Sequence, residues 1–130
     1  MKNVLLFLWL LCSLVLMWCG SSGASVGTDT DNVMLTADQQ TDTYKIYTTE
    51  TFDAAVADGK RVVLNFRASR CPTCTSVSND ILANQAALPT DVVVLEVDYD
   101  KYPAVKERYN VVQQTTFAFI DANWEYVETI

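Results

Sequence analysis

Two cysteines separated by two residues, Cys71 and Cys74, are the side chains of this sequence best suited to chemistry. Pro72 and Thr73 lie between them. Thiols at this spacing can form a disulfide, exchange it with another disulfide, or bind a metal. At the start of a helix, Cys71 would meet free backbone N–H groups and the positive end of the helix dipole, which favour a thiolate. Cys74 would then lie one turn into the helix and be more shielded.

An apolar strand and a helix are expected to position these thiols. Residues 61–66 contain a continuous apolar run, which is typical of a parallel strand buried on both faces. After the cysteines, apolar residues recur at spacings of three and four, which predicts a helix over residues 75–88. The thiols therefore lie at a junction between strand and helix.

The rest of the sequence alternates between the same two kinds of element. Further strands are expected at residues 44–47, 92–97, 117–120 and 125–130, and further helices at residues 49–57 and 103–109. Thr48 or Thr49 can cap the first helix, and Gly59 suits its end. Strands that alternate with helices predict an α/β domain with a mainly parallel sheet covered on both faces, and the last two strands form an antiparallel pair.

Composition excludes several classes of function. A chain of 130 residues has room for one compact domain. Its net charge of -7 and its lack of a Lys/Arg cluster argue against nucleic acid as a partner. The chain contains no histidine, which excludes Ser-His and Cys-His catalysis and His-based metal sites. Two of its four cysteines lie in the apolar N-terminus, so one chain cannot close a four-cysteine zinc site in its domain, and we expect no metal.

Residues 1–24 have the pattern of a targeting segment. Lys2 is followed, at residues 4–19, by a segment of sixteen mostly apolar residues without a charge, a length typical of a signal-peptide core. Cleavage after Ala24 would release a secreted protein, whereas lipidation of Cys19 would give a membrane-tethered lipoprotein; an uncleaved anchor is the third alternative. We favour the lipoprotein, although Trp18 is bulkier than the residue that usually precedes a lipidated cysteine. Each alternative places the domain outside the cytoplasm.

Residues 25–42 are polar and acidic, without a basic residue. A segment of this composition buries too little apolar surface to offset the entropy of ordering. We expect a flexible linker that joins the targeting segment to a domain at residues 43–130.

From residue 44 onward the sequence resembles the thioredoxin superfamily, and particularly its extracytoplasmic thioredoxin-like proteins. The resemblance is carried by residues 63–74 (VLNFRASRCPTC), 97–98 (VD), 109–111 (YNV) and 115–117 (TTF). It implies a central mixed sheet flanked by helices. The family fold usually continues with a C-terminal helix, and we expect this chain to lack it.

The resemblance also implies a function, a thiol-disulfide oxidoreductase that acts on protein disulfides or thiols. Cys71 would attack and Cys74 would resolve the mixed disulfide. The only redox group would be this cysteine pair, with no further cofactor. We favour a reductant supplied by a membrane electron carrier over an oxidant. Two alternatives stay open: a dimer that holds a metal or an iron-sulfur cluster between its cysteine pairs, and a purely structural disulfide.

Two departures from the family pattern concern proton transfer and the substrate loop. Asn65 stands where a buried aspartate is usual, so another carboxylate, Glu96 or Asp98, or water would have to handle protons. Thr115 replaces the family's cis-proline beside the cysteines, and we expect the bond between Gln114 and Thr115 to be trans because a cis bond there costs about 2.5–4 kcal/mol. Both residues are candidates for pairing with a substrate peptide, and a hydroxyl at position 115 could stabilise a thiolate.

Arginines replace two tryptophans of the family pattern, at Arg67 and Arg70. This substitution predicts a cationic surface around the site. Arg70 adjoins Cys71 and could lower the pKa of its thiol, and Thr73 could donate a hydrogen bond to a thiolate. Together with Pro72, these residues are the candidates for tuning the reactive cysteine.

Overall fold

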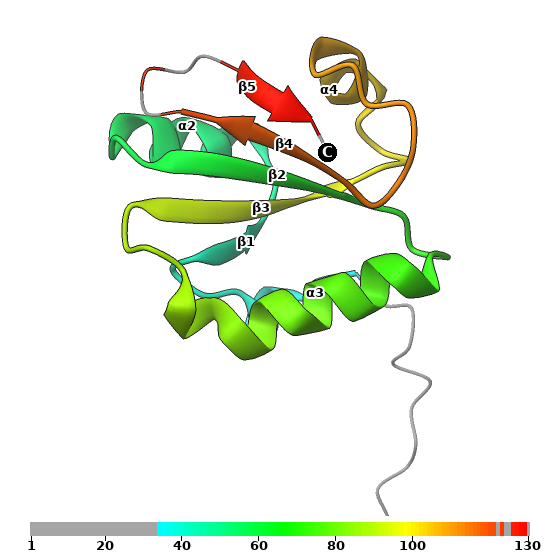
Figure 1. Ribbon diagram of the computed structural model, residues 1–130, viewed down its shortest axis with the longest axis horizontal. Coiled ribbons are helices and arrows are strands. Elements are labelled where there is room, and N and C mark those ends of the chain that lie inside the picture. The colour runs from blue at the N-terminus through cyan, green and yellow to red at the C-terminus, as the bar shows by residue number, and fades with distance from the viewer. Residues whose placement is uncertain (1–33, 122, 124–125, 130) are drawn as a thin grey trace, which may run out of the picture.

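The computed structural model describes residues 34–121, 123 and 126–129. Its five strands form one mixed sheet in the order β1-β3-β2-β4-β5 (Figure 1). The strands are β1 (Tyr44–Ile46), β2 (Arg61–Arg67), β3 (Val92–Asp98), β4 (Thr116–Ile120) and β5 (Tyr126–Thr129). The helices are α2 (Thr49–Ala57), α3 (Pro72–Asn84) and α4 (Pro103–Arg108), with short 3-10 turns η1 (Ala37–Gln39) and η2 (Gln85–Ala87).

β1, β3 and β2 pair in parallel, and β4 and β5 join the sheet by antiparallel pairing. β3 pairs in parallel with both β1 and β2, whereas β4 is antiparallel to β2 and β5 is antiparallel to β4. The predicted order of elements and the predicted mixed sheet flanked by helices are confirmed. The targeting segment, residues 1–24, lies outside the described residues.

Alternate residues of β2 face two different environments. Val62, Leu64 and Phe66 are completely buried and belong to the main hydrophobic core, which also includes residues of α2 and the C-cap residue of α4. Asn65 and Arg67 are also buried, but they point to the opposite face, which α3 covers (Figure 1). The end of β2 next to the cysteines is therefore apolar on one face and polar on the other.

The helix that carries the cysteines begins earlier than the sequence predicted. α3 starts at Pro72 instead of residue 75, and Cys71 is its N-cap residue. Proline is favoured at the first position of a helix because its missing N–H would have had no helical partner. The helix ends at Asn84, and η2 continues the chain to Ala87. This shift places both cysteines in the first turn.

The segment before β1 packs against the domain. Leu35 is buried, and its backbone N–H donates a 2.7 Å hydrogen bond to the Glu96 carboxylate. The expected linker, residues 25–42, therefore contacts the sheet at Leu35 and at Gln40, whose side chain accepts a 3.0 Å hydrogen bond from the Ile46 N–H, and the domain begins before residue 43. Burial of one leucine and a buried hydrogen bond to a carboxylate stabilise this contact, which the polar composition did not indicate.

The ends of α2 follow the predicted pattern. Thr48 is the N-cap residue, and its hydroxyl accepts a 3.1 Å hydrogen bond from the N–H of Thr51. Gly59 follows the helix with a φ of 68°. Glycine adopts this left-handed conformation without the steric cost that a Cβ atom adds.

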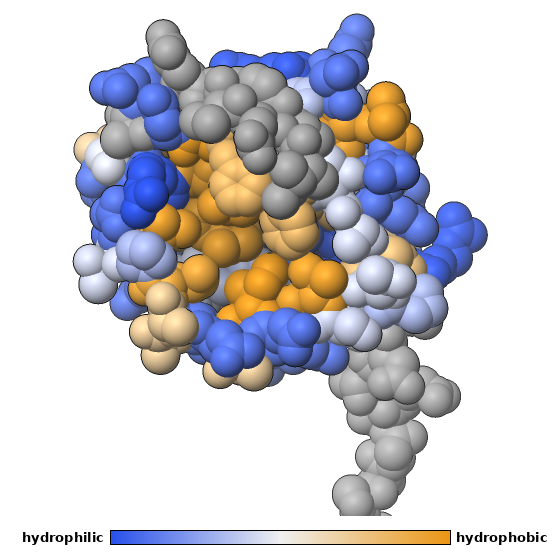
Figure 2. Space-filling model, viewed as in Figure 1, coloured by the Kyte–Doolittle hydropathy of each residue, from blue (hydrophilic) through white to orange (hydrophobic). Residues whose placement is uncertain are grey.

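One face of the molecule carries a cluster of apolar side chains. Figure 2 shows them gathered near the middle of the face that Figure 1 shows above α3. By strand register, Val63, Phe117 and Phe119 share the α3 side of the sheet, and all three are only partly buried. The rings of Phe117 and Phe119 lie 6.5 Å apart. The α3 side of β4 and of part of β2 is therefore only partly covered within the described residues.

Candidate active site

Cys71 and Cys74 are joined by a disulfide at the N-terminus of α3, with their Cα atoms 5.2 Å apart. The N–H of Cys74 donates a 3.1 Å hydrogen bond to the Cys71 sulfur, so Cys71 caps its own helix. Cys71 is 4% exposed and Cys74 is 1% exposed. The helix end and this N–H would both stabilise a thiolate at Cys71. Cys74 is almost completely screened from solvent.

Thr115 faces the disulfide from the loop before β4. Its hydroxyl oxygen lies 3.0 Å from the Cys74 sulfur and 3.4 Å from the Cys71 sulfur. None of the described peptide bonds is cis, which confirms the expected trans bond before Thr115. The residue instead adopts a φ of 60°, and its N–H donates a 2.9 Å hydrogen bond to the Phe66 carbonyl. A left-handed conformation is a true outlier for a β-branched residue.

Four other predicted site residues lie on the surface. Arg70, Pro72, Thr73 and Gln114 are all exposed. Pro72 is the first residue of α3, and none of the described contacts of Thr73 joins its hydroxyl to a sulfur. Thr115 is therefore the predicted candidate whose side chain reaches both sulfurs.

Tyr99 also contacts the cysteine site and was not predicted. It packs against the buried cluster of Ala68 and the two cysteines. The Lys106 ammonium lies 3.7 Å from the centre of its ring, and its hydroxyl donates a 3.1 Å hydrogen bond to the Val112 carbonyl. Tyr99 thus links the loop after β3 to the loop that leads to Thr115.

The prediction that Arg67 contributes to a cationic surface around the cysteines is wrong. Its side chain is only 4% exposed and forms an ion pair with Glu96, whose side chain is 1% exposed. Nη1 of Arg67 lies 3.3 Å from each oxygen of the carboxylate. A charge is stable in a protein interior when it is paired and hydrogen-bonded, and Glu96 supplies that partner.

Glu96 collects hydrogen bonds from three further elements. Besides Arg67, its donors are the Leu35 N–H at 2.7 Å, the Ser78 hydroxyl at 2.9 Å and the Tyr44 hydroxyl. Burial, followed by the charge and the hydrogen bond of Glu96, raises the pKa of Tyr44. Glu96 therefore connects β1, β2, α3 and the segment before β1 beneath the sheet face.

The buried pair also connects to the cysteine turn. Nη2 of Arg67 donates a 3.2 Å hydrogen bond to the Thr75 hydroxyl, which donates at 3.3 Å to the Cys71 carbonyl. Asn65 belongs to the same network, because its amide nitrogen lies 3.3 Å from the Tyr44 hydroxyl. Opposite charges within two otherwise apolar, neighbouring strands were the available sequence signal for this pair.

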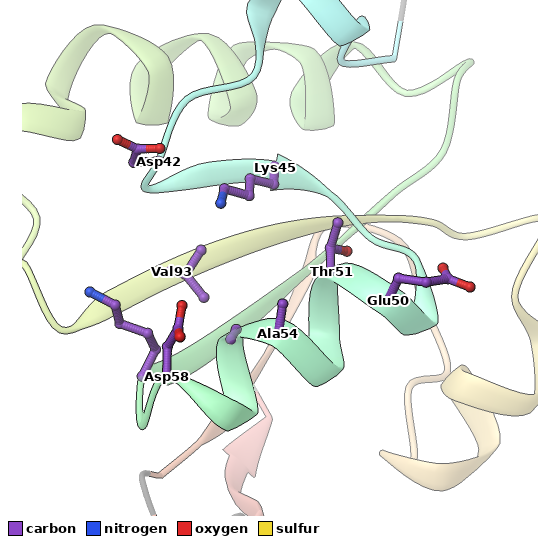
Figure 3. A pocket seen from close by; sticks show the side chains of 9 residues that line it. Asp42, Lys45, Glu50, Thr51, Ala54, Asp58 and Val93 are labelled. Atoms are coloured by element: carbon purple, nitrogen blue, oxygen red, sulfur yellow. The ribbon is translucent and has the colours of Figure 1, made fainter.

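A surface pocket of about 210 Å³ lies away from the disulfide, between α2 and the start of β3 (Figure 3). It is lined by Asp42, Lys45, Glu50, Thr51, Ala54, Ala55, Asp58, Lys60 and Val93. Val93 and Lys60 lie at the ends of the strands opposite to the cysteines. Charges of both signs line the pocket, and it contributes no side chain to the cysteine site.

The described part of the chain contains neither a cluster of metal ligands nor a membrane-spanning helix. No group of three or more possible metal ligands occurs among residues 34–121, 123 and 126–129. In the same residues, no helix has the length and apolar character needed to cross a membrane. The apolar segment that contains Cys12 and Cys19 lies outside these residues.

The model of the thioredoxin family matches residues 43–129, which include the whole sheet and the cysteine pair. The chain belongs to the thioredoxin family. It is 36% identical over 67 residues to "Thioredoxin-1" of Drosophila yakuba, a match that covers 52% of this chain and 63% of that protein. It is 34% identical over 82 residues to "Thioredoxin H3" of Arabidopsis thaliana, covering 63% of this chain and 68% of that protein. The match thus spans just under two thirds of the Drosophila relative.

Solved structures agree with this family assignment. The Trxlp structure from Edwardsiella tarda aligns with a TM-score of 0.57 and 26% identity, covering 68% of this chain and 85% of that chain. The germline-specific thioredoxin Deadhead from Drosophila melanogaster aligns with a TM-score of 0.57 and 25% identity, covering 66% of this chain and 83% of that chain. This thioredoxin-family chain therefore carries its cysteine pair on the fold that the sequence predicted.

Proposed function

We propose that this thioredoxin-family chain is a thiol-disulfide oxidoreductase that exchanges its Cys71–Cys74 pair with disulfides of proteins. The observation that carries the proposal is the disulfide in the first turn of α3, where the helix end and the Cys74 N–H both favour a thiolate at Cys71. Membership of the thioredoxin family supports exchange over a cluster-binding dimer or a permanently structural disulfide.

The reaction follows from the positions of the two sulfurs. In the reduced protein, the Cys71 thiolate attacks one sulfur of a substrate disulfide, and the other substrate sulfur leaves as a thiolate. Cys74, as a thiolate, then attacks the Cys71 sulfur and breaks the mixed disulfide. The second substrate sulfur leaves, and the Cys71–Cys74 disulfide forms. Two electrons pass from the chain to the substrate, so a dithiol donor must reduce the chain again.

We favour this direction, reduction of the substrate, with a dithiol carrier in a membrane as the donor. The basis is the resemblance of the CPTC sequence to extracytoplasmic reductases of the family. The stabilised Cys71 thiolate acts in the opposite sense, because stabilising the reduced form makes a disulfide more oxidising. A reduction potential, measured by equilibration with glutathione and with a dithiol buffer, decides between the two directions. A value close to that of reducing thioredoxins supports the reductant, and a strongly oxidising value supports an oxidase.

The location proposed for the domain is extracytoplasmic, with a membrane tether at Cys19. Its basis is the uncharged run after Lys2 and the polar residues that follow it. The test is fractionation of cells that produce the full chain or its Cys19→Ala variant. A lipid tether predicts that the full chain is found with membranes and that the variant moves to the soluble extracytoplasmic fraction. Equal membrane association of both proteins contradicts lipidation at this residue.

Catalysed reduction of a disulfide-bonded protein such as insulin tests the activity. The chain is expected to accelerate reduction by a small dithiol, and Cys71→Ser is expected to abolish the acceleration because it removes the attacking sulfur. Ser76→Ala, which changes an exposed residue of α3, is the matched control. Equal rates with the wild-type chain and Cys71→Ser would contradict the proposal.

A further inference from the structure

The Thr115 hydroxyl is placed to interact with the buried sulfur more closely than with the more exposed one. It lies 3.0 Å from the Cys74 sulfur and 3.4 Å from the Cys71 sulfur. Building on the function proposed above, we propose that Thr115 is a catalytic residue whose hydroxyl donates a hydrogen bond to the Cys74 thiolate and so activates it for resolution of the mixed disulfide.

Cys74 needs such a donor more than Cys71 does. Cys71 lies at the end of the helix and accepts the N–H of Cys74 at 3.1 Å. Cys74 is 1% exposed, so water stabilises its thiolate poorly, and burial disfavours the charged form. A hydrogen bond to the charged form opposes that effect. Thr115 is positioned to supply it.

The buried polar groups beneath the site are occupied elsewhere. The amide nitrogen of Asn65 contacts the hydroxyls of Tyr44 and Ser78, at 3.3 and 3.5 Å. Glu96 accepts hydrogen bonds from Tyr44, Ser78, Arg67 and the Leu35 N–H. None of the described contacts of Asn65 or Glu96 reaches a sulfur. Glu96, one of the two carboxylates considered from the sequence, therefore serves the network under the sheet together with Asn65, and the hydroxyl of Thr115 serves the sulfur.

The loop holds Thr115 in an unfavourable conformation. Its φ of 60° places a β-branched residue in the left-handed region, which such residues rarely adopt. Two hydrogen bonds fix the loop there: the Thr115 N–H to the Phe66 carbonyl at 2.9 Å, and the Thr116 hydroxyl to the Gln113 carbonyl at 2.8 Å. Backbone strain of this kind persists where the surrounding structure over-determines it, and it is common at functional sites.

The role assigned to the hydroxyl is hydrogen bonding, without loss of its proton. In the mixed disulfide, the Cys74 thiol loses its proton to water, and the hydroxyl donates to the resulting thiolate. The thiolate attacks the Cys71 sulfur, the bond between Cys71 and the substrate breaks, and its electron pair leaves on the substrate sulfur. Thr115 keeps its own hydrogen throughout. Thr115 therefore adds no atom and no electron to the exchange between the sulfurs.

The test measures the thiol of Cys74 directly. In a Cys71→Ser background, the rate of alkylation by iodoacetamide is followed against pH, and the peptide that contains Cys74 is read by mass spectrometry. Thr115→Val keeps the branched shape and removes the hydroxyl, and Thr115→Ser keeps the hydroxyl. Ser76→Ala, which removes a hydroxyl from an exposed residue of α3, is the control. Loss of a hydrogen bond to a charged group is expected to slow alkylation near neutral pH by about tenfold in Thr115→Val. Thr115→Ser and Ser76→Ala should react like the parent.

Every outcome of this comparison bears on the proposal. An unchanged rate in Thr115→Val overturns it, and so does an equal loss in Thr115→Ser, because the loss would then come from the backbone and not from the hydroxyl. If Thr115→Val does not fold, Thr115→Gly removes the hydroxyl and relieves the left-handed strain, and it should show the same tenfold loss. Alkylation needs no turnover. A chain that fails to reduce insulin but shows this pattern refutes the proposed function and keeps the hydroxyl's role.

Discussion

Replacing Glu96 by glutamine removes the negative charge of a buried ion pair and keeps the shape of the side chain. The partner, Arg67, is then left as a cation whose side chain is 4% exposed. Breaking a buried pair in this way typically costs about 3–5 kcal/mol, because the remaining charge has lost its partner away from water. For a domain of about 100 residues, this cost corresponds to a fall in melting temperature of more than about 10 °C. Glu96→Gln is therefore expected to be one of the most destabilising single changes in the sheet.

The assay is urea unfolding of the oxidised protein, followed by far-ultraviolet circular dichroism. Arg67→Met combined with Glu96→Gln is expected to be more stable than Glu96→Gln alone, because the second change removes the unpaired cation. Asp91→Asn is the matched control, since it breaks the exposed pair of Arg61 and Asp91 and should leave the midpoint almost unchanged. If Glu96→Gln costs no more than Asp91→Asn, the account of a buried pair is refuted.

Three further predictions concern pH, the backbone and the reactive thiol. Burial and the Glu96 charge raise the pKa of Tyr44, so only the unfolded state loses this proton just above pH 10. The contribution of Tyr44 to stability should therefore be constant below that pH and fall above it, and Tyr44→Phe should reduce the fall in urea titrations. Gly59→Ala should lower the free energy of unfolding by about 1–2 kcal/mol in the same titrations, because an alanine must hold a φ of 68° although its Cβ would contact nothing within 4 Å. Arg70→Ala should raise the pKa of the Cys71 thiol by removing a neighbouring cation, seen as a shift of its alkylation profile to higher pH, whereas an identical profile would rule out that role.

Most of the fold follows from apolar patterns in the sequence. The continuous runs in β2 and β3 predicted buried parallel strands, and each was found within about one residue of its expected bounds. The start of α3 was misplaced because its first apolar position lies well inside the helix. The combination of a capping side chain at Cys71 and a proline at position 72 indicates the true start.

The buried polar network was harder to predict because it depends on strand register. Arg67 stands where the family pattern has a tryptophan beside the site, so it was assigned to the surface. In the sheet, Asn65 is directly beside Glu96. Arg67 lies two residues further along β2 and therefore points to the same face as Asn65. Only the pairing of the two strands shows that these side chains meet. The left-handed backbone of Thr115 was unpredictable for a similar reason, since tertiary contacts impose it against the preference of the residue.

The most direct test of the central claim is to trap the mixed disulfide in the native compartment. In Cys74→Ser the Cys71 sulfur can attack a substrate, but the resolving sulfur is absent, so the covalent complex should persist. Cells that produce this variant are quenched with acid and alkylated, and the adducts are separated without reductant. The account predicts adducts with partner proteins that disappear on reduction and that are absent from the double variant Cys71→Ser/Cys74→Ser. Equal, empty lanes for both variants would contradict the assignment of this chain as a thiol-disulfide oxidoreductase.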